Sequence, residues 1–419
     1  MTGQALAQPR AFDGAGALLP RVLASRWAAL VVGLAACLLY LPIASQVHRD
    51  RPDFLYLADA FLHGRTWLDP ASWLGPQDVV QVGAHVYVPF GPFPAILLMP
   101  LVAITGAASL VPSEFVLNSL IAGTCVGLAW CLLARFDSGR LGDRLWLVIL
   151  FAFSTEMWSV TVQGGVWHTG QLVAVALVLG ALLEATGRRR PLLMGLLIGA
   201  ALLCRAPLAL AVPFFILVAC WGPAGATRRT SAAGRWSPGA LRRGGLALLG
   251  VLPAVAFLAW YDAARFGSPF ESGYGLATLT EPVLIAAREQ GLFALSHLPT
   301  NLRYLLLELP IPAPPPLFLQ PDRYGFSILL QSPALLLGAK ARWRDPFVAA
   351  AGLTALAVLL PSLLYYGGGF FQFGFRYFLD ALPFVLVLVA SGARLPLTWP
   401  WKALIAFGVA VNAWGVLFS

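Results

Sequence analysis

The side chains best suited to chemistry gather early in the chain, in the segment "RPDFLYLADAFLHGRTWLDP" at residues 51–70. Wound as a helix at about 100° per residue, this segment has one polar and one apolar arc. The polar arc holds Asp53, Tyr56, Asp59, Ala60 and His63. Because a long apolar run precedes the segment, we expect an amphipathic helix at a membrane interface, with its polar arc facing water. A carboxylate placed there can accept a proton from a hydroxyl group.

These polar residues also have purely structural interpretations. Asp53 follows Pro52, so it can simply complement the partial positive charge of a helix N-terminus. Asp59 can be a solvated surface residue, and His63 has no HxxH or HExxH partner that would indicate a metal site. The segment alone therefore leaves both catalysis and helix capping open.

Three further charged residues stand in apolar surroundings. Arg205 lies in "ALLCRAPLAL", and Arg376 and Asp380 lie in "FQFGFRYFLDALP", where another apolar segment begins. Charges at membrane depth are costly and usually face a functional cavity. A guanidinium in such a place can hold an anionic headgroup. For both arginines, the alternatives are snorkelling toward the interface and pairing with a buried acid.

The composition defines the broad class of protein. The chain is 59% hydrophobic and 11% charged, with a mean hydropathy of +0.77. Its long apolar runs predict an all-α polytopic membrane protein, because a helix satisfies its own backbone in lipid. The net charge of +9 comes mostly from arginines in short loops, so it does not indicate nucleic-acid binding. The five cysteines lie in apolar runs without a CxxC pair, which argues against a zinc site or a disulfide framework.

Eleven apolar segments are expected to span the membrane. They are residues 27–47, 115–134, 145–162, 170–186, 191–204, 207–222, 246–261, 326–339, 347–366, 378–391 and 403–418. A further apolar segment, 93–111, decides the orientation of all that follow it. If it does not span, the predicted cytoplasmic segments hold 19 of the 28 lysines and arginines, as the positive-inside rule requires. We therefore place 93–111 in the first external loop and the N-terminus inside.

The resulting domain organisation is simple. A cytoplasmic leader, 1–26, precedes a single transmembrane domain, 27–419, with no obvious soluble domain. Two large external loops cover residues 48–114 and 262–325. The second contains the proline-rich segment 310–321, which we expect to be extended because proline lacks a backbone donor.

The order of these motifs resembles the glycosyltransferase C fold, whose members include protein O-mannosyltransferases and aminoarabinose transferases. The similarity is carried by a first span, a loop with "PDFLYLADAFLHG", then "GPFPAILLMP", then the basic residue in "LLCRAPLAL". The segments "WYDAARFGSPFESGYG" and "FGFRYFLDALPF" are similar to segments of the uncharacterised bacterial members. The resemblance covers most of the chain in layout, although each motif is short.

The resemblance implies roles for individual residues. The family moves a sugar from a polyprenyl-phosphate carrier, with an aspartate of the first external loop as general base and basic residues around the donor phosphate. Asp53 matches that aspartate, and Arg205 matches the membrane-level basic residue. Many members have an Asp-Glu pair where Phe54 follows Asp53 here. For the second acid of the family, the chain offers only Glu156, with His168 nearby.

Further substrate contacts are expected from side chains near these motifs. The candidates for binding donor or acceptor are Arg376, Tyr56, His63, Glu271 and Tyr274. For Glu271 and Tyr274, which lie in "FESGYG", capping of the loop is the alternative interpretation. No cofactor is indicated with any confidence, and a divalent metal is not supported by a ligand motif.

The sequence thus predicts an inverting membrane glycosyltransferase. Its donor would be a polyprenyl-phosphate-linked sugar, its acceptor a lipid, glycan or protein hydroxyl, and its location a bacterial inner membrane with the site facing outward. Membrane lipids are expected partners and nucleic acid is not. One alternative is a lipid-linked glycan ligase or polymerase, which would use the late-loop residues Arg265, Arg288, His297, Arg303 and Arg323. Another is a transporter, although no internal duplication is evident.

Overall fold

The computed structural model describes residues 27–48, 51–69, 77–136, 140–221, 236–315, 318–369, 371–393 and 396–418. The predicted leader, 1–26, lies outside them. Within them the chain is helical apart from two short antiparallel ribbons. These pair β1 (Val80–Val82) with β2 (His85–Tyr87), and β3 (Ile311–Pro312) with β4 (Leu319–Gln320). The all-α class is confirmed, and β3 and β4 are extended as expected for the proline-rich segment.

Six helical stretches among the described residues are long and apolar enough to cross a membrane. They are α2 (Ala28–Val47), Ala107–Leu133, α9 (Val166–Thr186), α12 (Ala240–Phe266), α16 (Pro346–Leu364) and α18 (Trp399–Phe418). The second stretch combines α5 (Ala107–Leu110), the 3₁₀ turn η2 (Val111–Ser113) and α6 (Glu114–Leu133). Helices α7 (Leu141–Phe153) and α8 (Glu156–Gln163) form a seventh candidate that is bent by 49°.

The predicted count of eleven spans is not confirmed, and the differences fall on four segments. Three are apolar helices shorter than the ~20 residues that cross a bilayer. These are α10 (Pro191–Leu202), the 3₁₀ helix η3 (Ala206–Ala211) continued by α11 (Val212–Cys220), and α17 (Leu382–Gly392). The fourth, predicted at 326–339, is instead α15 (Ile328–Gln331) and the 3₁₀ helix η5 (Pro333–Lys340). The break falls at Pro333, which cannot donate to an α-helical ladder.

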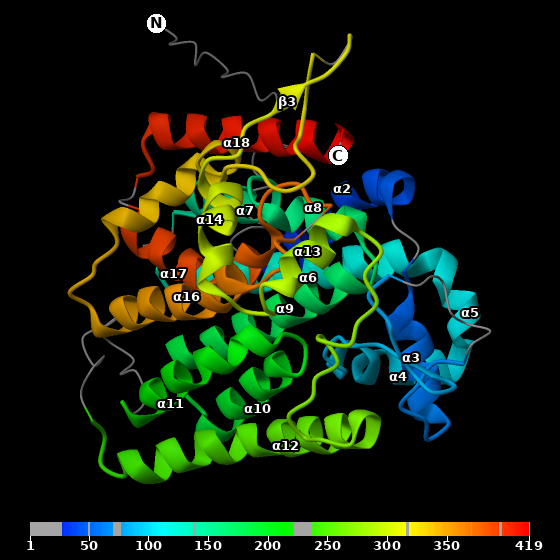
Figure 1. Cartoon of the computed structure of the whole chain (residues 1–419). Helices are drawn as coiled ribbons and strands as arrows, with labels where there is room; N and C mark the ends of the chain where they lie inside the picture. The colour runs from blue at the N-terminus through cyan, green and yellow to red at the C-terminus, as the bar shows by residue number, and fades with distance from the viewer. Residues whose placement is uncertain are drawn as a thin grey trace, which may run out of the picture.

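Close contact between small residues holds the bundle together. Helix α2 packs along α6, where a Cβ on Gly33 would lie 2.5 Å from the carbonyl oxygen of Gly123. Helix α10 packs along α12 through Gly195 and Gly250 in the same manner. Any larger side chain there would push the helices apart, as is usual for helix pairs in membranes. In Figure 1, α12, α16 and α18 run across the view, while α3, α4 and α5 lie to the right.

The segment predicted to be the first external loop folds against itself. Helix α3 (Asp53–Leu62) packs on α4 (Phe93–Thr105), with Phe54, Leu57 and Ala58 in a shared apolar core. The 13 residues of α4 make a helix of roughly 20 Å, less than the ~30 Å of hydrocarbon in a bilayer. This length suits the predicted assignment of 93–111 to the loop, except that residues from Ala107 onward join the span of α6.

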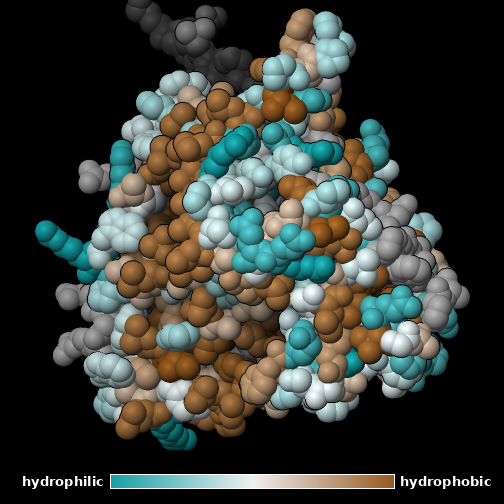
Figure 2. Space-filling model, in the orientation of Figure 1, coloured by the Kyte–Doolittle hydropathy of each residue, from teal (hydrophilic) through white to brown (hydrophobic). Residues whose placement is uncertain are grey.

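The segment 262–325, predicted to be the second external loop, lies against the first of these loops. It contains α13 (Pro282–Glu289), the 3₁₀ turn η4 (Leu295–His297) and α14 (Leu298–Leu306). The Asp78 N–H donates to the Thr278 carbonyl, at 2.9 Å, and the Thr278 N–H donates to the Val79 carbonyl, at 2.8 Å. These bonds fix the two loops to each other. In Figure 2, hydrophobic residues dominate the left and lower parts of this face, and hydrophilic residues gather toward the centre and right.

Candidate functional site

A cavity of about 370 Å³, which we call the central cavity, lies where the segments 77–114 and 262–325 meet the helix ends. Its wall is largely aromatic and aliphatic, with Phe90, Trp167 and Phe293 among the lining residues. The ionisable acids and bases that line it are Asp78, Arg205, Glu281 and Arg376, together with the phenols of Tyr274, Tyr365, Tyr366 and Tyr377. An apolar enclosure with a few convergent charges is the usual form of a binding site.

Arg205 is neutralised by a buried acid. Its Nε lies 3.1 Å and its Nη2 2.9 Å from Oδ2 of Asp380, whose side chain is fully buried. Arg205 connects α10 to η3, and Asp380 ends the 3₁₀ helix η6 (Arg376–Asp380). The predicted alternative of a buried acidic partner therefore applies to Arg205. The pair ties two segments 175 residues apart to the cavity wall.

Arg376 lies in the same wall but without a carboxylate partner. No Asp or Glu among the described residues comes within 4.0 Å of its guanidinium, and its Nε is buried without a hydrogen-bond acceptor. The backbone is fixed, since its N–H donates to Gln372 Oε1 and its carbonyl accepts from Gln171 Nε2, both at 2.9 Å. A held guanidinium that lacks a counter-charge beside a cavity is suited to binding an anion.

The two arginines share one aromatic neighbour. The guanidinium carbons of Arg205 and Arg376 lie 5.2 Å and 5.3 Å from the ring centroid of Tyr377. Contact with this ring favours both cations where water is scarce. Nearby, burial raises the pKa of the predicted site residue Tyr274 to about 12, so its phenol is a neutral hydrogen-bonding group at physiological pH.

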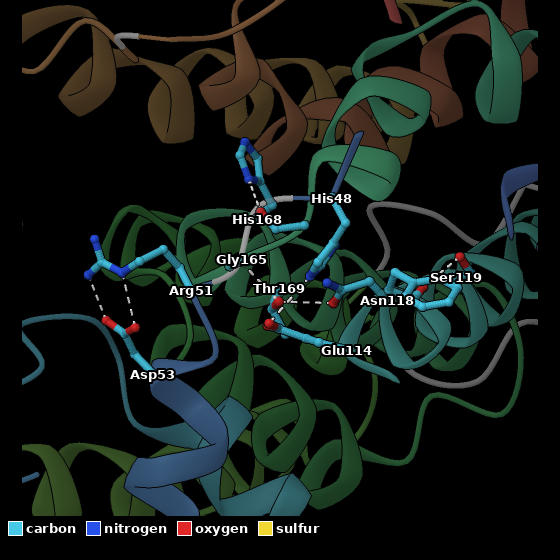
Figure 3. Close-up of polar contacts among 11 residues, drawn as sticks. His48, Arg51, Asp53, Glu114, Asn118, Ser119, Gly165, His168 and Thr169 are labelled. Carbon is cyan, nitrogen blue, oxygen red and sulfur yellow. Dashed lines mark hydrogen bonds and ion pairs between the residues drawn. The ribbon is translucent and has the colours of Figure 1, made fainter. Parts of the chain in front are cut away.

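Asp53 stands one layer behind the cavity wall. Both of its carboxylate oxygens accept from Arg51, at 3.1 Å and 2.8 Å, and its side chain is buried at the first turn of α3 (Figure 3). Arg51 in turn lies 4.6 Å from the ring centroid of Trp167, which does line the cavity. The sequence drew attention to Asp53 and missed Arg51, although the two are separated by a single residue.

Asp78 is a second acid of the first loop and lines the cavity directly. Its Oδ2 accepts a hydrogen bond of 2.8 Å from the Trp167 indole. Its backbone has φ of 58°, a left-handed conformation that is uncommon outside glycine. Such a conformation is held by its surroundings and often marks a functional position. The sequence gave no signal for Asp78, because it lies in a loop without periodicity.

A buried polar cluster lies beneath Asp53, between α2, α6 and α9. His48 Nε2 is 3.4 Å from Glu114 Oε2, and Thr169 donates to Asn118 Oδ1 at 2.9 Å (Figure 3). These four side chains are buried or nearly so. The two contacts join these groups in pairs, while His48 Nδ1 and Asn118 Nδ2 are buried without a hydrogen-bond partner among the described residues.

Other predicted site residues lie away from the central cavity. Tyr56 does not line it, and His63 is exposed and contacts Asp59 of its own helix. Glu271 accepts from the Gly273 N–H at 2.8 Å, so it caps its own loop, as the alternative interpretation proposed. Glu156 is fully buried at the start of α8. The central cavity thus brings together Arg205, Arg376 and Tyr274.

The arginines of the ligase alternative do not line the central cavity. Arg265 pairs with Asp262, Arg303 pairs with Glu308, and Arg288 donates to the Ala277 carbonyl. Within the described ranges, no group of three or more His, Cys, Asp or Glu side chains could hold a metal ion.

The chain is similar in structure to an archaeal oligosaccharyltransferase. The Archaeoglobus fulgidus enzyme tethered to an acceptor peptide with the NVT sequon aligns at 15% identity, over 93% of this chain and 56% of its own, with a TM-score of 0.44. AglB of the same organism, in complex with an inhibitory peptide and a dolichol-phosphate, aligns at 14% identity, over 93% and 57%, with a TM-score of 0.43. No protein-family model and no curated protein matches the chain. It spans little more than half the length of these enzymes, so their activities are not assigned to it.

Proposed function

We propose that this membrane protein is a glycosyltransferase of the glycosyltransferase C type, which transfers a sugar from a polyprenyl-phosphate carrier to an acceptor hydroxyl. One observation carries the proposal. Arg376 presents a guanidinium in the wall of a largely apolar cavity, and none of the described carboxylates pairs with it, whereas Arg205 is already neutralised by Asp380. The free positive charge fits a phosphate, and the apolar wall fits the start of a prenyl chain.

The proposed reaction is an inverting displacement at the sugar. The acceptor oxygen forms a bond to the anomeric carbon while the bond from that carbon to the phosphate oxygen breaks. The hydroxyl proton passes to a carboxylate, and polyprenyl phosphate leaves. Arg376 stabilises the charge that develops on the leaving phosphate, which is where a fixed cation contributes most.

Asp53 remains our proposed proton acceptor, on the strength of its match to the family aspartate. Its carboxylate is occupied by Arg51, so the mechanism requires this contact to open. Arg51 already lies against Trp167 of the cavity wall. A donor phosphate in the cavity would offer Arg51 a second anionic partner, and movement of Arg51 toward it would release Asp53 toward the acceptor.

Asp78 is a second candidate for the same role. In its favour, it lines the central cavity while Asp53 does not. Its Trp167 contact occupies one oxygen, which leaves the other available for a substrate hydroxyl. The turnover of Asp53→Asn, compared with that of Asp78→Asn, distinguishes the two candidates for the proton acceptor.

We further propose that the cavity faces the outer side of a bacterial inner membrane. The segments that line it lie in the first loop, at Trp167, at Arg205, in the second loop, and at and after the end of α16, and all of them lie at the outer side of the predicted topology. In intact cells and a cysteine-free background, Asp78→Cys and Glu281→Cys should react with an impermeant thiol reagent, and Arg188→Cys should be protected. Labelling of Arg188→Cys alone would reverse the orientation.

The direct test of the donor class is mass spectrometry of lipids that co-purify with the protein. The proposal expects polyprenyl phosphate or its glycosylated form in the wild type and a reduced amount in Arg376→Ala. Recovery of ordinary phospholipids alone, in equal amounts from both proteins, would remove the donor assignment.

A further inference from the structure

A second cavity, which we call the second pocket, has a volume of about 290 Å³ and lies between α13, α14 and residues 366–368. Leu284, Tyr366 and Gly367 line both the second pocket and the central cavity. A ligand in the second pocket would therefore end beside the proposed phosphate site. The volume is near the ~300 Å³ at which ligand pockets begin, enough for one or two sugar rings.

The second pocket differs from the central cavity in its charge. Among the described residues that line it there is no Asp, Glu, Lys or Arg, and His297 is the one imidazole. The Nε2 of that imidazole lies 2.9 Å from the Gly291 carbonyl and so is a donor occupied within the protein. The pocket is not suited to a phosphate, a carboxylate or a charged peptide, because burying such a group without a counter-charge is costly.

The polar groups of the pocket instead suit hydroxyl groups. Gln290, Ser296 and Thr300 offer both donors and acceptors at its edge, where all three are exposed. The rings of Tyr304 and Tyr324 lie nearly parallel, at 12° and 5.9 Å between centroids. Flat aromatic faces bordered by hydroxyl and amide groups match a sugar ring, which has an apolar C–H face and a polar rim.

The shape of the pocket is fixed before any ligand arrives. Asn301 donates to the carbonyls of Leu363 and Tyr365, each at 2.9 Å, and so ties α14 to the end of α16. Burial raises the pKa of the Tyr304 and Tyr366 phenols, which therefore stay neutral and can donate hydrogen bonds. A preformed site loses less free energy to ordering when it binds.

We infer that the second pocket binds the acceptor, and that this acceptor is a neutral glycan whose reacting hydroxyl extends into the central cavity. The inference rests on the proposed function, since it places the acceptor next to the donor phosphate. A lipid tail does not explain the polar rim of the pocket. A peptide would leave its backbone groups facing aromatic rings without a strand edge to pair with.

The test uses the full chain in detergent and saturation-transfer NMR. The probes are neutral methyl glycosides of glucose, galactose, mannose and arabinofuranose, and farnesyl phosphate as the anionic probe. Ala286→Trp places an indole at the pocket, because Ala286 lines it. Its matched control, Ile285→Trp, changes the adjacent residue of α13, which is exposed and lines neither cavity.

We expect at least one glycoside to bind the wild type and Ile285→Trp, and its affinity to fall at least tenfold in Ala286→Trp. Farnesyl phosphate should bind all three proteins equally and should not displace the glycoside. If farnesyl phosphate binds but no glycoside does, or if Ala286→Trp still binds the glycoside, the acceptor assignment is wrong and the donor site stands. Binding of a neutral tripeptide that depends on Ala286, in place of the glycosides, would also overturn it. Failure of farnesyl phosphate to bind the wild type would remove the proposed function itself, and the acceptor assignment with it.

Discussion

The central cavity and the second pocket share part of one wall and differ in what that wall carries. The first holds two carboxylates and two guanidinium groups, and the second, among the described residues, holds none. Leu284, Tyr366 and Gly367 line both cavities, so the charged and the neutral walls meet at these three residues. In the proposed reaction, ionic groups are needed only where a phosphate leaves and a proton is taken up. The neutral pocket can then select hydroxyl-bearing molecules without attracting free phosphate.

Removal of the proton acceptor should have the largest effect on the proposed reaction. Asp53→Asn keeps the size and much of the hydrogen bonding of the side chain but cannot take a proton. Turnover should fall by the ~10²–10⁴ typical of general-base removal, while binding of the glycoside and of the donor is retained. The measurement is the single-turnover rate of purified protein with saturating donor.

Two matched variants sharpen the result. Asp59→Asn, on the same helix but partly exposed, should keep wild-type turnover. Asp78→Asn should lose turnover only if Asp78, rather than Asp53, takes the proton. Full activity in Asp53→Asn together with loss of activity in Asp78→Asn would identify Asp78, which lines the central cavity, as the general base.

A second comparison sets the paired arginine against the unpaired one. Asp380→Ala leaves the Arg205 guanidinium partly buried without its counter-charge, which should cost about 3–5 kcal/mol of stability. Arg376→Ala leaves no carboxylate without its partner, so it should lower the free energy of unfolding far less. Denaturant unfolding of both variants in detergent measures the difference. Equal destabilisation would mean that Arg376 has a structural partner and is not held for a ligand.

The smallest expected effect concerns Tyr274, whose pKa is raised to about 12 by burial, from an ordinary value of about 10. Because the folded pKa is the higher one, the stability that this phenol contributes is complete below pH ~10 and is lost between pH ~10 and ~12. The melting temperature of the wild type should therefore fall more steeply over that window than that of Tyr274→Phe. Parallel curves would show that Tyr274 is not buried as described.

The features of the fold that depend on composition could be predicted from the sequence. Long uncharged runs predicted α2, α9, α12, α16 and α18, because the need to satisfy backbone groups in lipid leaves few alternatives to a helix. Arg205 and Arg376 were found because a charge in an apolar run is conspicuous. Short helices such as α10 and α17 were counted as full spans, since hydropathy cannot separate a helix that crosses from one buried among others.

The features that depend on tertiary contacts could not be predicted from the sequence. The Arg205–Asp380 pair joins residues 175 positions apart, and no local pattern indicates that Asp380 is the buried acid next to Arg205. Asp78, Tyr324 and Tyr366 lie in loops, where no periodicity indicates which side chains meet.

The amphipathic pattern of α3 correctly predicted that Phe54, Leu57 and Ala58 are buried. The expectation that Asp53 faces water was wrong, because Asp53 is buried and its carboxylate is held by Arg51.

The central claim is that Arg376 holds the donor phosphate, and its most direct test is calorimetric titration of the full chain with farnesyl phosphate. A hydrogen bond to a charged group contributes about 1.5–3 kcal/mol, so Arg376→Ala should raise the Kd by roughly 10- to 150-fold. Arg303→Ala serves as the matched control, because Arg303 is exposed and lines neither cavity. The account predicts weakened binding in Arg376→Ala alone. The same Kd in the wild type, Arg303→Ala and Arg376→Ala would contradict it.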